Sequence, residues 1–281
     1  MIEALSEKNL NEANAFLSKH EETAQFLINN LSAHGHKLSE HPNSGNFKML
    51  RKSGSVVGVF SLTRRGNLII ESVEDESELI LKECLNEAIK INGFIGNWPS
   101  VEPLYKLFKN KNPDFKPVYE SKEILYSYLI NSSDEKIQRD PRVRLLQIED
   151  FSQWLNFSKA YMEELSLPEK LTKEEIRIQF ETQINNKVWW GLFDGQKLLS
   201  RAGLNSKGET VGQVGGVFTP KEFRKKGYSK ATMFHMLKDC LELHHHKKSI
   251  LFTAQNDIPA QKLYESMGYF KIGFFALILG G

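Results

Sequence analysis

Three basic side chains and a glycine stand directly before a helical pattern, and this arrangement could bind a phosphate group. Arg224, Lys225 and Lys226 supply positive charge, and Gly227 lets a ligand approach the backbone where a Cβ would intrude. The first turn of a helix offers unpaired N–H donors and the positive end of the helix dipole. Residues 224–230 are therefore predicted to form an anion-binding turn.

The flanking residues predict a strand before this turn and a helix after it. Residues 210–219 are rich in β-branched and apolar side chains, and Pro220 ends the strand pairing. From Ser229 to about Leu243, apolar residues recur at steps of three and four, as on one face of a helix. The expected order is thus strand, tight basic turn, helix.

Arg224-x-x-Gly227-x-Ser229 resembles the pyrophosphate loop of the GCN5-related N-acetyltransferase (GNAT) superfamily, which usually reads Gln/Arg-x-x-Gly-x-Gly/Ala. Ser229 departs mildly from that pattern. Asn256, followed by a helix that bears Tyr264 and closes on glycine and an aromatic residue, resembles the second signature of the family. The sequence of residues 217–228 is most similar to the glycine N-acyltransferase-type (FR47-like) branch. The resemblance to the superfamily covers residues 142–279 well.

The resemblance implies that acetyl-coenzyme A is a cosubstrate and that no metal is needed. The backbone of the loop would hold the diphosphate, and the backbone of the preceding strand would bond the pantetheine arm. The residues implied in coenzyme binding are Val217, Phe218, Thr219, Arg224, Lys225, Lys226, Gly227, Tyr228, Ser229, Lys230 and Asn256.

Tyr264 is implied as the general acid that protonates the coenzyme thiolate, because a tyrosine pKa of about 10 lies above that of a thiol. The alternative is that its ring only packs under the last strand. Asn256 is expected to cap the helix that starts near Pro259, to bond the pantetheine arm, or to do both.

The general base is left open. Gln213 occupies the position where many relatives have a glutamate, and an amide cannot accept the proton. Glu209 falls on the same strand face, although it lies near a turn. Glu163 and Glu164 end the first helix of the second domain, which the resemblance places beside the acceptor pocket. No base is needed if the acceptor amine arrives neutral.

The first half repeats the order of elements of the second half. Where a pyrophosphate loop would stand, however, residues 71–76 offer four carboxylates and no glycine. An anionic turn repels phosphate. Residues 1–130 are therefore predicted to be a degenerate GNAT-like copy that no longer binds coenzyme A, with an unrelated α/β domain as the alternative. Residues 131–141 are polar and are predicted to form a linker. Residues 142–281 are predicted to form the catalytic domain.

Local signals place the elements of the second domain. Asp150 is a plausible N-cap for the helix of residues 151–165, and Thr172 with Glu175 forms a capping box for the next helix. Asp194-Gly195 predicts a tight hairpin. Trp189-Trp190 on one of its strands should send one ring to each sheet face, one into the core and the other toward the acceptor cleft.

Composition limits the remaining functions. A net charge of +2 selects neither nucleic acid nor membrane, and no aromatic-basic stripe accompanies the basic turn. The adjacent histidines 244–246 do not face one point, so a metal site is disfavoured. Cys84 and Cys240 read as buried apolar residues. With no leader or membrane-spanning run, a cytoplasmic protein is expected.

Taken together, the sequence predicts an α/β protein with mixed sheets and tandem GNAT-like domains, the C-terminal one being a complete acetyltransferase fold. The predicted function is acyl-coenzyme A-dependent N-acyltransfer, most simply of acetyl to the amine of a small molecule or amino acid. The alternatives are an N-acyltransferase for longer acyl groups and a non-catalytic coenzyme A-binding regulatory module. The acceptor is not identified, and both a monomer and a homodimer are compatible with the sequence.

Overall fold

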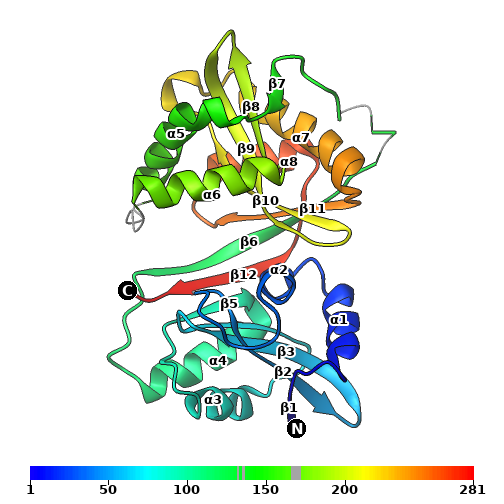
Figure 1. The fold of residues 1–281 in the computed structure, drawn as a ribbon, viewed down its shortest axis with the longest axis vertical. Coiled ribbons are helices and arrows are strands. Elements are labelled where there is room, and N and C mark those ends of the chain that lie inside the picture. Colours follow the sequence, from blue (N-terminus) through cyan, green and yellow to red (C-terminus); the bar gives the residue numbers. More distant parts are fainter. Residues whose placement is uncertain (132, 135–136, 166–171) are drawn as a thin grey trace. The chain divides into compact units, whose positions relative to one another are not determined.

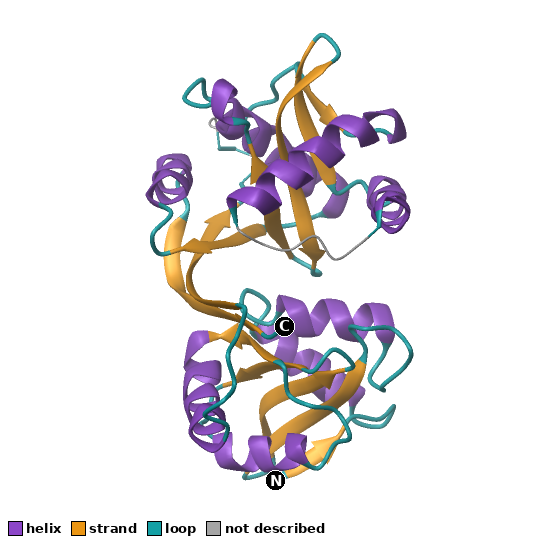
Figure 2. Ribbon diagram, turned by 90° about the vertical axis from the view of Figure 1, so that its left-hand side faces the viewer, coloured by secondary structure: helices purple, strands orange, loops and turns teal. Residues whose placement is uncertain are grey.

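The computed structural model describes the 281 residues except 132, 135–136 and 166–171. The chain forms two compact units. Unit 1 comprises Met1–Ser127, Phe252–Glu265 and Tyr269–Gly281, and unit 2 comprises Tyr128–Leu251 and Ser266–Gly268. Each is built on a mixed β-sheet with helices packed against it (Figure 1, Figure 2).

The sheet of unit 1 is antiparallel apart from one parallel pair. Its strands, in spatial order, are β1 (Ile2–Ala4), β2 (Gly45–Lys52), β3 (Ser55–Thr63), β4 (Asn67–Ser72), β5 (Gly93–Asn97), β12 (Phe270–Leu279) and β6 (Tyr119–Leu129). The parallel pair is β4 and β5, which match from Asn67↔Gly93 to Ile70↔Gly96. The pairing with β5 stops there, whereas Glu71 of β4 still pairs with Val59 of β3.

Helices from three parts of the chain complete unit 1. They are α1 (Leu10–Lys19), α2 (Gln25–His34), α3 (Ser77–Leu85), α4 (Trp98–Lys111) and most of α8 (Ile258–Met267). α1 and α2 contact β3 and β4. Side chains of α3 and α4 share a core with Phe60, Leu62 and Leu68, which line the sheet. The apolar face of each of these helices therefore packs on the strands and buries them.

The last strand of the chain belongs to unit 1. Phe275–Leu279 of β12 pair with Asn97–Gly93 of β5, and the other edge of β12 pairs with β6. Phe275 also stacks on Phe252 at 5.0 Å between ring centroids. The compact units are thus discontinuous in sequence, unlike the predicted ranges 1–130 and 142–281. Those ranges, as the limits of two repeated domains, stay a prediction.

The sheet strands of unit 2 are β7 (Val143–Leu145), β8 (Trp189–Asp194), β9 (Lys197–Lys207), β10 (Val211–Phe218) and β11 (Lys248–Ala254, of which unit 2 holds the residues up to Leu251). β10 and β11 are parallel, and the other pairs are antiparallel. The predicted hairpin is confirmed: β8 turns into β9 at Gly195, which has φ +56°.

Helices cover both faces of this sheet. They are α5 (Phe151–Glu164), α6 (Lys173–Asn185) and α7 (Tyr228–His244). Trp189 donates from Nε1 to Gln183 of α6 at 2.7 Å, whereas Trp190 donates to Asp239 of α7 at 2.7 Å. The prediction that the two rings leave opposite faces is therefore confirmed, because adjacent strand residues alternate.

Two capping predictions have different outcomes. The capping box of Thr172 and Glu175 is confirmed at the start of α6. Asp150 precedes α5, but its side chain makes no cap bond to that helix. Its carboxylate instead accepts from the Gln147 N–H at 2.8 Å and binds the Arg144 guanidinium, so it stabilises the short 3₁₀ turn Ile148–Asp150.

The described part of residues 131–141 is fastened to unit 2. Arg139 pairs with Asp239 at 2.6 Å and with Glu242 at 2.7 Å, both on α7. The linker predicted from polar composition is therefore tied down near its end. Within the described part of the chain, no helix combines the length and apolar character needed to cross a bilayer.

Candidate active site

The turn before α7 has the backbone of an anion-binding loop. Lys225 and Gly227 both adopt left-handed conformations, with φ +63° and +79°. α7 begins at the next residue, Tyr228, and runs for 17 residues. In the described parts of the chain, the N–H groups of Lys225, Lys226 and Gly227 have no hydrogen-bond acceptor. Left-handed residues before a helix N-terminus turn such donors toward one concavity.

Space lies in front of this loop. A Cβ built on Gly227 meets no atom within 4 Å, and residues 224–227 are exposed. Lys225 and Lys226 form no ion pair with any residue that the structure describes. The predicted phosphate-binding turn therefore has free donors, free positive charge and open volume, and it fits a diphosphate.

β10, which leads into the loop, pairs with β11 over only the first part of its length. It pairs with β11 only from Val211↔Lys248 to Gln213↔Ile250. Its register with β9 also breaks between Gly215 and Phe218, where Gly216 has φ +61°. Residues Gly215 to Val217 are half-buried. A strand whose outer edge is unpaired can bond the amides of an extended ligand.

Side chains fasten the end of β10 to the start of α7. Thr219 is buried, and its Oγ1 donates to Ser200 Oγ at 2.9 Å and contacts Ser229 Oγ at 2.8 Å. The serine that replaces the usual glycine or alanine of the resembled motif thus has a partner. Lys230 reaches the Ser266 carbonyl oxygen, to which its Nζ donates at 3.1 Å.

Arg224 is engaged by the protein itself. Its Nε donates to the Thr219 carbonyl oxygen, and its Nη2 donates to both carboxylate oxygens of Glu164, all at 2.8 Å. The guanidinium therefore holds the loop against α5. Its charge is largely met by Glu164, so the donors left for phosphate are the backbone groups and the two following lysines.

A pocket of about 540 Å³ opens beside the end of β10. It is lined by Asn156, Phe157, Ala160, Glu163 and Glu164 of α5 and by Phe218, Pro220, Lys221 and Glu222. Its walls combine aromatic rings with carboxylates, a composition that suits a small amine.

The carboxylates considered as bases are not equivalent. Glu163 lines the pocket and has no ion-pair partner among the described residues, whereas Glu164 is bound by Arg224. Glu209 is exposed in the turn between β9 and β10. Gln213 is buried, and its Nε2 is among the atoms for which the described chain offers no acceptor. Of the three carboxylates considered as bases, Glu163 is the one that combines access to the pocket with a carboxylate that no described residue pairs; Glu222 lines the same pocket.

The second predicted signature lies in unit 1. Tyr264 on α8 is buried, and its ring lies 6.1 Å from that of Tyr126 and 6.0 Å from that of Tyr269. Asn256 is exposed. The prediction that Asn256 caps the helix was wrong. α8 begins at Ile258, and the preceding Asp257 accepts from the Ala260 N–H at 3.0 Å, because a carboxylate one residue later reaches the third helical N–H.

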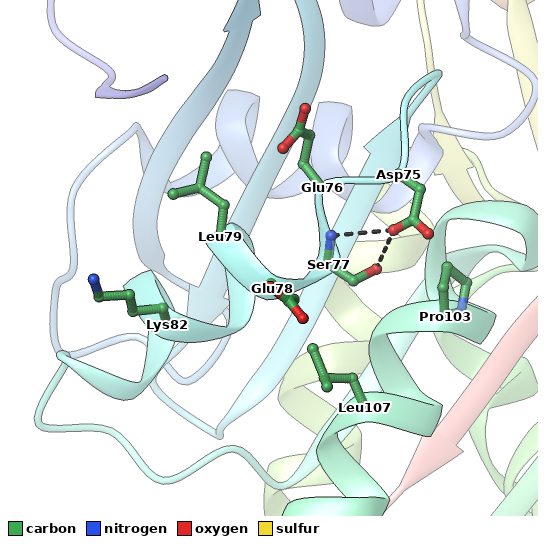
Figure 3. A pocket seen from close by; sticks show the side chains of 8 residues that line it. All are labelled: Asp75, Glu76, Ser77, Glu78, Leu79, Lys82, Pro103 and Leu107. Atoms are coloured by element: carbon green, nitrogen blue, oxygen red, sulfur yellow. Dashed lines mark hydrogen bonds between the residues drawn. The ribbon is translucent and has the colours of Figure 1, made fainter.

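A second pocket, of about 750 Å³, lies in unit 1 where α3 follows β4 (Figure 3). Asp75, Glu76 and Glu78 line it, and Asp75 accepts from the N–H and Oγ of Ser77 at 3.1 and 2.6 Å. A protein carboxylate therefore already caps the start of α3. A phosphate brought there would meet the negative charge of these carboxylates.

Two further groups bear on the predictions. Cys84 and Cys240 are both free and buried, as the sequence indicated, and burial raises the pKa of the Cys84 thiol to about 12. No cluster of three or more potential metal ligands occurs in the described residues. His244 lies at the end of α7, where its Nε2 contacts the Lys187 carbonyl oxygen.

Arg201 of β9 is a buried charged residue that the sequence reasoning missed. Its side chain is buried, 2% exposed, between α5 and the sheet. The available signal was a lone arginine within the strand pattern of residues 198–204, which is otherwise small and apolar. Such a charge, placed inside a predicted sheet, calls for a partner.

Comparison with known proteins agrees with this geometry. Residues 149–269 match the model of the acetyltransferase (GNAT) family. None of the curated proteins matches the chain significantly.

Solved structures match the whole chain. A Drosophila protein matches with TM-score 0.65 and 14% identity, covering 99% of this chain and 98% of its own. A GNAT-family acetyltransferase from Colwellia psychrerythraea matches with TM-score 0.57 and 13% identity over 100% of both chains. A tandem GNAT protein from the clavulanic acid biosynthesis pathway matches with TM-score 0.52 and 10% identity, covering 100% and 98%. The chain therefore has a mixed α/β, tandem GNAT-like fold, and its residues 149–269 match the model of the GNAT acetyltransferase family.

Proposed function

We propose that this protein is an N-acetyltransferase that moves acetyl from acetyl-coenzyme A to the amine of a small molecule or amino acid. The observation that carries the proposal is the loop of Lys225 to Gly227. Two left-handed residues, unpaired N–H donors and open space stand at the N-terminus of a 17-residue helix. The match of residues 149–269 to the GNAT family supports acyl-coenzyme A as the donor in general.

The predicted coenzyme residues divide by what each offers. Backbone N–H groups from Lys225 to Lys230 would hold the diphosphate, and the exposed lysines 225 and 226 would add charge. Val217, Phe218 and Thr219 would present the unpaired edge of β10 to the pantetheine arm. Arg224, Ser229 and Thr219 hold the loop in shape through the bonds described above.

Bound acetyl-coenzyme A would supply the activated thioester. The protein must keep the amine neutral and provide a proton for the departing sulfur. Glu163, which lines the pocket, would take a proton from the bound amine. By the family resemblance, Tyr264 would donate the proton to the sulfur through its Oη. Asn256 would contact the pantetheine arm.

Calorimetric titration with acetyl-coenzyme A tests the loop. Gly227→Val places a β-branched residue at φ +79°, in front of the donors, and should abolish binding. Gly195→Val is the matched control, because Gly195 also has positive φ and open space but lies in the β8–β9 hairpin turn. The control should fold less stably and still bind.

The stoichiometry tests the predicted degenerate copy. We expect one site per chain, because carboxylates occupy the start of α3 in unit 1. Two sites would contradict that prediction. No binding by the wild type would overturn the proposed function.

Two alternatives are separated by an amine screen that follows release of free thiol. Gln213, which cannot accept a proton, favours a coenzyme A-binding regulatory module. That function is supported if acetyl-coenzyme A binds and no amine releases thiol. An enzyme for longer acyl groups is supported if such a donor outperforms acetyl-coenzyme A with the same amine.

A further inference from the structure

Arg201 is a buried cation that no carboxylate of the described residues pairs. Its Nη1 donates to Ser158 Oγ at 2.7 Å and more weakly to the Trp154 carbonyl oxygen at 3.3 Å. No ion pair joins it to any residue in the described ranges, and its Nε is buried without an acceptor there. A guanidinium has five N–H donors, and a charge kept out of water is costly unless it is paired.

The unused donors form one edge of the guanidinium. Nε–H and the neighbouring Nη2–H point the same way, and neither has an acceptor among the described residues. These two parallel donors are one of the guanidinium edges that can bind a carboxylate in bidentate fashion. The protein thus orients Arg201 through Nη1 and leaves a carboxylate-binding edge open.

A second unused donor lies nearby. The Nε1 of Trp154 is buried without an acceptor in the described structure, and Arg201 Cζ lies 5.3 Å from the Trp154 ring. Cζ also lies 4.8 Å from the ring of Trp189, whose centroid is 5.6 Å from that of Trp154, so the two rings meet each other beside the guanidinium. Unpaired buried donors are rare in native proteins, and two adjacent ones indicate that an acceptor-rich group is missing.

Trp189 is held in place by glycines. A Cβ on Gly203 would lie 2.5 Å from its ring, and one on Gly216 would lie 2.4 Å from it. Both glycines lie on the strands that enter the candidate site. Aromatic faces give the charge partial compensation through cation–π contact, but they supply no hydrogen-bond acceptor. Burial lowers the pKa of Arg201 to about 9, consistent with a charge that lacks its counter-ion.

The same elements build the acceptor pocket. Arg201 is the register partner of Phe218, which lines the pocket from β10. Ser158, which receives the Arg201 hydrogen bond, directly follows Phe157, another pocket residue. Arg201 therefore adjoins the parts of α5 and β10 that form the wall of the pocket, without being one of the lining residues itself.

We propose that Arg201 binds the carboxylate of the acyl acceptor, so that the substrates are amino acids or other amines that bear a carboxylate. Nε and Nη2 would hold the two carboxylate oxygens, and Trp154 Nε1 would donate a third hydrogen bond. Arg201 is in this sense a residue that determines specificity. The inference rests on the proposed function, since it identifies the acceptor of that same pocket.

Matched acceptor pairs test the proposal by thiol release from acetyl-coenzyme A. Each amino acid is compared with its carboxamide, which keeps the amine and side chain and removes the negative charge. The wild type should prefer the acid by at least about 100-fold in kcat/KM, because a site built for a charged group rejects an analogue that lacks it. Arg201→Met should lose that preference, and Arg201→Lys should keep part of it.

Arg177→Gln is the control, because it removes an equal charge from an exposed pair with Glu181 on α6. It should keep the preference. Binding of acetyl-coenzyme A shows that each variant is folded. Equal rates with acids and carboxamides in the wild type would overturn the proposal.

A second measurement does not depend on turnover. The rings of Trp154 and Trp189 both lie close to the guanidinium, so N-acetyl amino acids should change the tryptophan fluorescence of the wild type, and their carboxamides should not. If thiol release fails with every amine while this acid-specific change occurs, the transferase proposal fails and the carboxylate site stands. If neither member of any pair changes the fluorescence or the rate, the site is refuted.

Discussion

Arg224 Nη2 lies 2.8 Å from both carboxylate oxygens of Glu164, while its Nε donates to the Thr219 carbonyl oxygen. One guanidinium thus joins the end of β10, the loop before α7 and the end of α5. The loop residue expected to bind phosphate through its side chain is used to hold the loop backbone in place.

Arg224→Gln and Glu164→Gln should therefore weaken acetyl-coenzyme A binding to a similar, small extent, about 2- to 10-fold each, because the pair is partly exposed. The double variant should bind no more weakly than either single one. Calorimetry across this double-mutant cycle measures the coupling. Fully additive losses would show that Arg224 contacts the coenzyme independently of Glu164.

Glu163 and Glu209 provide a test of the base. Glu163→Gln should lower kcat by about 10- to 100-fold at neutral pH and leave acetyl-coenzyme A affinity unchanged, because it removes a proton acceptor from the pocket. Glu209→Gln, at an exposed turn, should change neither quantity. A wild-type rate for Glu163→Gln would mean that the amine reacts without this carboxylate.

Tyr264→Phe removes one hydroxyl from a buried ring in α8. We expect kcat to fall by roughly 100-fold with little change in coenzyme affinity, because the departing sulfur loses its proton donor. Steady-state rates and calorimetry separate the two effects. If only the thermal stability changes and kcat does not, the ring has a packing role alone.

Glu71 should make the stability of unit 1 depend on pH. Burial raises the pKa of its carboxyl from 4.5 to about 7, and hydrogen bonds from Thr23 and Asn97 oppose that rise only partly. His20 Nδ1 lies 3.8 Å away, but burial lowers the pKa of His20, so it does not neutralise the carboxylate at neutral pH.

The folded state holds the Glu71 proton more tightly than the unfolded state does. This contribution to stability is complete below about pH 4.5 and is lost as the pH rises to about 7, a loss of about 3 kcal/mol. Glu71→Gln should flatten that dependence, whereas Glu78→Gln, at an exposed position, should not. Denaturant unfolding between pH 4.5 and 8 measures it, and identical slopes for wild type and Glu71→Gln would contradict it.

Local features could be predicted from the sequence because they depend on neighbours along the chain. The left-handed turn at Gly227, the hairpin at Gly195 and the capping box at Thr172 each involve a few consecutive residues. Their conformations follow from the absence of a Cβ or from a hydroxyl within reach of an N–H. The family resemblance rests on the same short segments.

Other features were decided by the tertiary structure. The sequence predicts β12 as a buried strand but does not identify its partners, which in the structure are β5 and β6. Glu71 and Glu76 are alike in the sequence, but one lies inside unit 1 and the other lines an open pocket. Arg201 is one basic residue among many until α5 buries it without a carboxylate. Burial and pairing depend on residues far away in the chain, so the sequence by itself determined the loop, whereas the folded sheets decided which charges are left without partners.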